Sequence, residues 1–205
     1  VMVVALSAVV SFQRVPHWKN SEALFSHERL INPRSLLAPI HLGVVYENQD
    51  RLTDALALFT EARSIDQQSG LAATSTARVL EKMGKVEEAE EVYQIATEKK
   101  ILRSAVAFSQ LARLRIEKDN VKGAEQALQS GLKRFPSDLN LMLDFAVLET
   151  SYKKRPSEAL LWYDQILKIS PKHADALQGK GVALIEIGQV REGKAVLIKL
   201  LKLYP

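Results

Sequence analysis

The sequence contains no cysteine, which excludes disulfides, cysteine-based zinc clusters and thiol catalysis but does not identify a cellular compartment. Its nine glycines are scattered, so there is no glycine-rich loop of the kind that holds phosphate groups. The four histidines form neither an HxxH nor an HExxH spacing, which argues against a metal site. No stretch alternates apolar and polar residues between turn residues, so strands are not expected. We therefore predict neither an enzyme active site nor a bound cofactor in this chain.

The charged residues are mixed along the chain rather than gathered by sign. Lysine and arginine total 28, aspartate and glutamate total 24, and the formal net charge is +4. Nucleic-acid binding is favoured by a basic face with interleaved aromatic residues, and the sequence lacks that pattern. The acidic run "VEEAEEVY" places carboxylates around Ala89, which is typical of a solvated helix face. A nucleic-acid partner is therefore not expected.

A small residue recurs through the chain with a nearly constant period. Its positions are Ser21, Ala55, Ala89, Ala124, Ala159 and Gly193, spaced 34, 34, 35, 35 and 34 residues apart. An aromatic residue or a leucine follows four residues later in every case, at Phe25, Phe59, Tyr93, Leu128, Tyr163 and Leu197. A proline lies twelve residues after the small residue at Pro33, Pro136, Pro171 and Pro205. Such a period predicts an array of helix–turn–helix repeats.

Each repeat unit is predicted to be a pair of helices joined by a polar turn. Gly43 and Tyr46 share one face of a first helix, while Ala55 and Phe59 share one face of a second. We expect Gly43 and Ala55 to be small because the two helices approach closely there. Later turns carry Gly84 and Gly188, which suit a helix C-cap. Because one unit cannot bury its own apolar face, neighbouring units must stack.

The chain resembles the tetratricopeptide repeat (TPR) family, and the stretch "GKVEEAEEVYQIA" is the closest to that family's consensus. The resemblance implies an all-α fold, a right-handed superhelical solenoid of antiparallel helix pairs. It places an apolar segment and a partial opening repeat at residues 1–35. Five repeat units then follow at 36–69, 70–104, 105–138, 139–173 and 174–205. The two extra residues fall near "TEKKILRS" and in the turn "SYKKRPSE".

In this family the first helices line a concave groove, through repeat positions 2, 5, 6, 9, 12 and 13 counted from the start of each unit. The resemblance therefore implies partner-binding residues at His41, Thr74, Arg78, Ser109, Gln110, Arg113, Asp144 and Gln178. Glu47, Ser75 and Lys82 fall on the same set of positions. Arg78 and Arg113 both occupy position 9, so we expect them side by side, able to hold an acidic or carboxylate-bearing segment. The alternative is that they pair with Glu81 and Glu117 on their own helices.

Residues 1–12, "VMVVALSAVVSF", are almost entirely apolar. Twelve residues are too few to span a bilayer, so the segment is either the first helix of the opening unit or the end of a membrane helix that tethers the chain. The following stretch, "VPHWKNSEALFSHERLINPRS", resembles the junction between the last membrane helix and the TPR region of O-mannosyltransferase-like glycosyltransferases. The side of the membrane, and the localisation as a whole, are left open.

The leading functional prediction is a non-enzymatic scaffold that binds an extended segment or a helix of a protein partner in its groove. The alternative is an accessory TPR domain of a multi-spanning membrane glycosyltransferase whose catalytic part lies N-terminal to this chain. Leu197, Leu200 and Leu201 are expected to lack a neighbour at the C-terminal end, which leaves end-to-end self-association as a further option.

Overall fold

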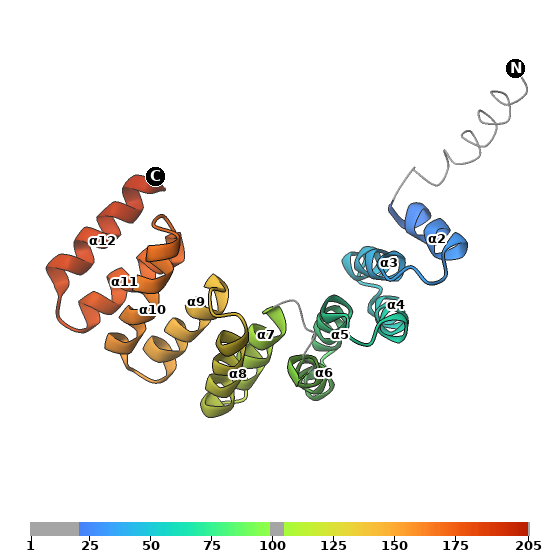
Figure 1. The fold of residues 1–205 in the computed structure, drawn as a ribbon, viewed down its shortest axis with the longest axis horizontal. Coiled ribbons are helices and arrows are strands. Elements are labelled where there is room, and N and C mark those ends of the chain that lie inside the picture. The colour runs from blue at the N-terminus through green and yellow to red at the C-terminus, as the bar shows by residue number, and fades with distance from the viewer. Residues whose placement is uncertain (1–20, 99–104, 205) are drawn as a thin grey trace, which may run out of the picture. The chain divides into compact units, whose positions relative to one another are not determined.

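The computed structural model describes residues 21–98 and 105–204, and all the regular structure in these ranges is helical. The predictions for residues 1–12 lie outside the described residues. The helices are α2 (Ser21–Ile31), α3 (Leu37–Asn48), α4 (Leu52–Ile65), α5 (Gly70–Lys82), α6 (Val86–Glu98), α7 (Val106–Glu117), α8 (Val121–Arg134), α9 (Leu139–Val147), the π-helix η2 (Leu148–Tyr152), α10 (Pro156–Ile169), α11 (Ala174–Glu186) and α12 (Val190–Leu203) (Figure 1). Within these ranges no helix is both long and apolar enough to cross a membrane.

The chain divides into two compact bodies, residues 1–104 and 105–205, called here the N-terminal and C-terminal bodies. In the N-terminal body α3 pairs with α4 and α5 with α6, and α2 packs on α3. In the C-terminal body α7 pairs with α8, α9 with α10, and α11 with α12. The predicted fold class, an all-α right-handed solenoid of antiparallel helix pairs, is confirmed.

The turn inside each repeat unit ends the first helix in the same way. One residue there has a positive φ: Asp50, Gly84, Asp119, Lys154 and Gly188. In every unit except the one with Lys154, the next residue donates its backbone N–H five residues back, as Lys85 does to the carbonyl oxygen of Leu80 at 2.9 Å. This is the hydrogen bond of a Schellman motif, and it explains why glycine suits positions 84 and 188.

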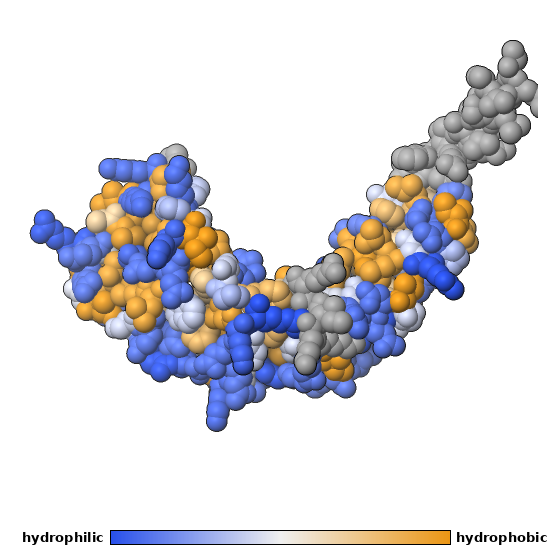
Figure 2. All heavy atoms as spheres, viewed as in Figure 1, coloured by the Kyte–Doolittle hydropathy of each residue, from blue (hydrophilic) through white to orange (hydrophobic). Residues whose placement is uncertain are grey.

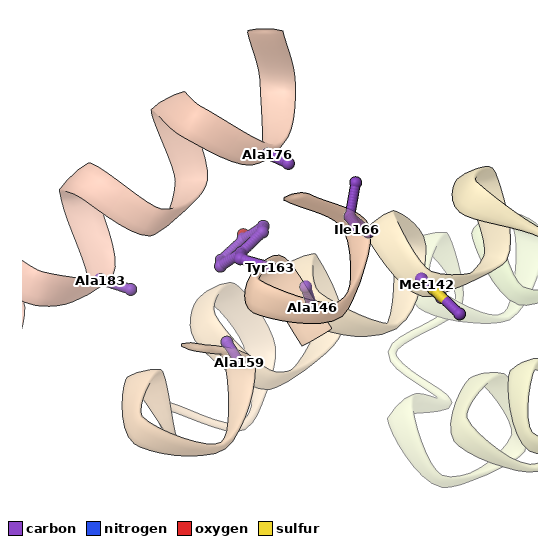
Figure 3. Packing of buried hydrophobic residues seen from close by; sticks show 7 residues of the cluster. All are labelled: Met142, Ala146, Ala159, Tyr163, Ile166, Ala176 and Ala183. Atoms are coloured by element: carbon purple, nitrogen blue, oxygen red, sulfur yellow. The ribbon is translucent and has the colours of Figure 1, made fainter. Parts of the chain in front are cut away.

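The core consists of small and aromatic residues contributed by adjacent helices. In the N-terminal body Phe59 is fully buried, and a Cβ atom on Gly43 would lie 2.6 Å from Cε1 of its ring. The small size of Gly43 is therefore required by Phe59. In the C-terminal body Tyr163 of α10 lies against α11, near Ala183 (Figure 3). Fully burying an aromatic or aliphatic side chain of this size stabilises the fold by about 1.5–3 kcal/mol.

The fourth repeat unit differs from the others because its first helix continues as η2. Lys153 donates its backbone N–H to the carbonyl of Leu148, five residues back, at 3.0 Å. The backbone N–H of Arg155 then donates to the carbonyl of Glu149, six residues back, at 2.7 Å. In the other units the corresponding N–H donates to a carbonyl five residues back. The extra residue, expected within "SYKKRPSE", is thus absorbed by a π-helix that begins before that stretch.

Candidate functional site: a groove between α9 and α11

The first helices of the last two repeat units form a cavity of about 700 Å³. From α9 and its π-helical extension the lining residues are Leu143, Val147, Thr150 and Ser151, followed in the turn by Lys154 and in α10 by Pro156 and Tyr163. From α11 they are Asp175, Gln178, Gly179, Val182 and Glu186. Counted from residues 139 and 174, the lining residues on these two helices fall on repeat positions 2, 5, 6, 9, 12 and 13. The cavity therefore occupies the face that the family resemblance assigns to partners.

Apolar side chains form the centre of this groove. Val147 is 40% exposed and Val182 is 43% exposed, although both are aliphatic and lie on well-formed helices. Tyr163 forms the floor, where a Cβ atom on Gly179 would overlap its ring. Figure 2 shows apolar residues at the surface of the α10–α12 part of the molecule among hydrophilic side chains. The groove thus exposes aliphatic surface above a rigid aromatic floor.

The rim of the groove is polar. Asp175 and Glu186 are exposed carboxylates at the two ends of α11, and Lys154 is the one cation among the lining residues. Burial is the main cause that raises the pKa of the Tyr163 hydroxyl, and the nearby charge of Glu186 adds to that rise. The rim therefore carries two negative charges and one positive charge.

An ionic network surrounds the buried Glu149, which precedes the lining residue Thr150 in η2. The Glu149 side chain is 4% exposed, and its carboxylate accepts from Arg155 Nε at 2.8 Å and from Lys153 Nζ at 2.9 Å. Lys153 also contacts Glu125 of α8 at 2.6 Å. Burial raises the pKa of Glu149, and Arg155 offsets part of that rise. The network ties η2 to the turn that carries Lys154.

Most of the predicted partner-binding residues already have contacts within the protein. The His41 ring stacks on Phe25, with 4.8 Å between the ring centroids. Thr74 donates to the carbonyl oxygen of Gly70 in its own helix at 2.9 Å. Ser109 and Asp144 come together through a side-chain hydrogen bond, while burial raises the pKa of Asp144. Gln178 is exposed and lines the groove.

The two arginines at position 9 are also paired, and they lie in different bodies. Arg113 contacts Glu117 at 2.7 Å and donates to Gln110 at 2.9 Å, as in the alternative considered from the sequence. Arg78 contacts Glu47 of α3 at 2.5 Å, whereas the alternative had placed it on Glu81. Their placement side by side stays a prediction.

Glu47 is an unusual partner for Arg78 because its side chain is completely buried. Oε1 receives both Arg78 and Lys82, the latter at 2.6 Å, and Oε2 has no hydrogen-bond partner. The two cations therefore compensate one buried carboxylate, which leaves a single net positive charge at this point of the N-terminal body.

Sequence reasoning missed the apolar members of the groove, among them Leu143, Val147 and Val182. The signal was present, since these residues occupy positions 5 and 9 of their units, the same positions as Thr74 and Arg78. The sequence prediction covers only the polar residues at those positions. No cluster of potential metal ligands occurs in the ranges 21–98 and 105–204.

These features define a solenoid of stacked helix pairs with a groove on its first-helix face. Models of the tetratricopeptide repeat match residues 74–138 and 175–205, so both stretches consist of tetratricopeptide repeats. Among solved structures, YrrB, described as a TPR protein with an unusual peptide-binding site, is 19% identical. It matches over 88% of this chain and 92% of its own, with a TM-score of 0.62. A MamA structure is 17% identical over 82% of this chain and 91% of its own, with a TM-score of 0.64.

Among curated proteins, the chain is similar to the human protein O-mannosyl-transferase TMTC3. The two are 22% identical over 202 residues, which is 98% of this chain and 20% of TMTC3. The chain thus spans a fifth of the length of this relative.

Proposed function

We propose that the chain is a non-enzymatic scaffold that binds an extended or helical segment of a protein partner in the groove between α9 and α11. The observation that carries the proposal is the cavity of about 700 Å³ with exposed aliphatic side chains above Tyr163. An apolar side chain of the partner would remove Val147 and Val182 from water, at about 25 cal/mol per Å² of apolar surface buried. The peptide-binding site of YrrB, a protein of the same fold, supports this use of the fold.

The test replaces both exposed valines with aspartate, Val147→Asp and Val182→Asp. Because each valine is partly exposed, we expect a small loss of stability but loss of the partner from affinity capture. The matched control is Leu161→Asp on α10, since Leu161 is 65% exposed and does not line the groove. Equal capture by the double variant and by the control would contradict binding in this groove.

The predicted acidic contact at Arg78 and Arg113 belongs to the same proposal as a second feature of the partner. An acidic segment would have to compete with Glu47 for Arg78 and with Glu117 for Arg113. We expect the double substitution of both arginines by alanine to weaken binding at least about tenfold, which corresponds to about 1.4 kcal/mol. Binding measured by calorimetry with unchanged affinity would show that the two arginines only compensate their own carboxylates.

The second candidate function is an accessory TPR domain of a membrane O-mannosyltransferase-like protein. The similarity to TMTC3 over 98% of this chain favours it, in agreement with the resemblance of residues 15–35 to the membrane junction of such proteins. Vesicle flotation tests the tether: residues 1–205 should float with phosphatidylcholine vesicles, and residues 21–205 should remain at the bottom. Flotation of neither protein would count against a membrane tether through residues 1–12.

A further inference from the structure

The charges around the α9–α11 groove indicate what kind of segment it accepts. We propose that the groove selects a segment in which an aliphatic side chain is flanked by basic residues; this inference rests on the proposed function. The groove supplies an apolar centre and a rim whose carboxylates, Asp175 and Glu186, outnumber its one cation, Lys154. Neither carboxylate forms an ion pair with another residue in the described ranges.

The two rim carboxylates differ in what they do for their helix. Asp175 lies in the first turn of α11, where a negative charge stabilises the helix macrodipole. Glu186 is the last residue of α11, where a negative charge is unfavourable for the same reason. Helix stabilisation therefore accounts for Asp175 but not for Glu186. A cationic partner would relieve this charge at the helix end.

Other cations near the groove are already compensated. Lys153 and Arg155 are held by Glu149 and Glu125, so these four residues add no net charge. The net charge on this face is therefore negative, opposite to the single positive charge at Arg78, Lys82 and Glu47.

The length of α11 sets the spacing expected in the partner. Asp175 and Glu186 are eleven residues apart, which corresponds to about 16 Å along a helix. An extended chain covers this distance with about five residues at 3.3 Å each. An aliphatic residue placed over Val147 and Val182 then has basic residues two or three positions away on either side.

The experiment measures fluorescence anisotropy of the full chain with three labelled nine-residue peptides in a glycine–serine background. The first has a central leucine with lysines two positions away on each side. The second has glutamates in place of the lysines, and the third has alanine in place of the leucine. We expect the first peptide to bind best, and raising the salt concentration to weaken its binding because exposed charges are screened.

The variant for this test is the pair Asp175→Asn and Glu186→Gln, which keeps the shape of the rim and removes its negative charge. It should weaken binding of the lysine–leucine peptide about fivefold, because it removes the two exposed ion pairs between the rim carboxylates and the peptide lysines. The matched control, Glu158→Gln with Glu192→Gln, removes two exposed carboxylates outside the groove lining and should leave the affinity unchanged.

The outcomes separate this inference from the proposed function. If the leucine is required but lysines and glutamates serve equally well, the charge preference is wrong and the apolar groove stands. If the lysine peptides bind with or without leucine, binding is electrostatic and the apolar groove is wrong. A dissociation constant of about 1 mM corresponds to a binding free energy of about −4 kcal/mol. If none of the three peptides binds this tightly, both proposals are overturned.

Discussion

At the residue scale, the small side chain of Ala89 is required by its surroundings. Ala89 on α6 and Ala77 on α5 are both completely buried in the N-terminal body, where the two helices pack against each other. A larger side chain has no free space there, and neighbouring side chains must leave their preferred rotamers to admit it. The periodic small residue is therefore a packing requirement, as its spacing predicts.

Ala89→Leu should lower the free energy of unfolding by about 1–3 kcal/mol through overpacking. Urea denaturation followed by circular dichroism measures this loss. The control is Ala57→Leu on α4, an exposed alanine of the same body, which should shift the midpoint little. An unchanged midpoint for Ala89→Leu would mean that the predicted repeat register is wrong.

Arg78 has a role in stability that the sequence did not predict. Its position in the repeat predicts only a contact with the partner. The structure instead places it on the buried Glu47, so its removal leaves that carboxylate with Lys82 as its remaining cation. We expect Arg78→Ala to cost about 1–3 kcal/mol, as for other buried acceptors that lose a partner. Arg78→Ala combined with Glu47→Gln should recover part of this loss in the same urea experiment, and equal stability of the single and double variants would exclude the coupling.

At the element scale, the π-helix η2 shows how an extra residue alters a repeat without disturbing its neighbours. The insertion widens the last turn of the first helix, and its residues Thr150 and Ser151 line the groove. The deviation needs support because a π-helix is rare, and the ionic network around Glu149 provides it. The element that departs most from the repeat is therefore part of the candidate site.

Glu149 should make stability depend on pH in a defined direction. Its pKa is raised above the ordinary value of 4.5, mainly by burial, so the folded state holds its proton more tightly than the unfolded state. The resulting contribution to stability is fully present below pH 4.5 and is lost as pH rises through the higher pKa of the folded state. Thermal denaturation across this window should show that Glu149→Gln gains stability relative to the unmodified chain as pH rises.

The control for this pH dependence is Glu192→Gln, an exposed carboxylate in the first turn of α12. Its stability relative to the unmodified chain should not change with pH in the same way. Parallel curves for the unmodified chain and Glu149→Gln would show that Lys153 and Arg155 fully compensate the buried charge.

At the scale of the whole molecule, the sequence was sufficient for the fold and only partly sufficient for the candidate site. The period was readable because Ala55, Ala89 and Ala159 recur in phase with the aromatic residues that pack beside them. The groove was harder to predict from the sequence, because Val147 and Val182 resemble ordinary core residues and only the structure shows that they are exposed. The contact between Glu47 and Arg78 joins two repeat units, and no spacing within one unit indicates it.

The division into two bodies leads to the last prediction, that residues 105–205 fold without the N-terminal body. This part has its own core, including the fully buried Leu128, Leu141 and Ile166, and every residue that lines the α9–α11 groove belongs to it. In repeat proteins stability comes from each unit and its immediate neighbours, so three stacked units should be enough for a cooperative transition. We expect the isolated segment to melt cooperatively by circular dichroism and to bind the lysine–leucine peptide with the affinity of the full chain. A helical but non-cooperative segment would show that its core depends on contacts with residues before 105. A cooperative segment that has lost the peptide would place part of the binding surface in the N-terminal body.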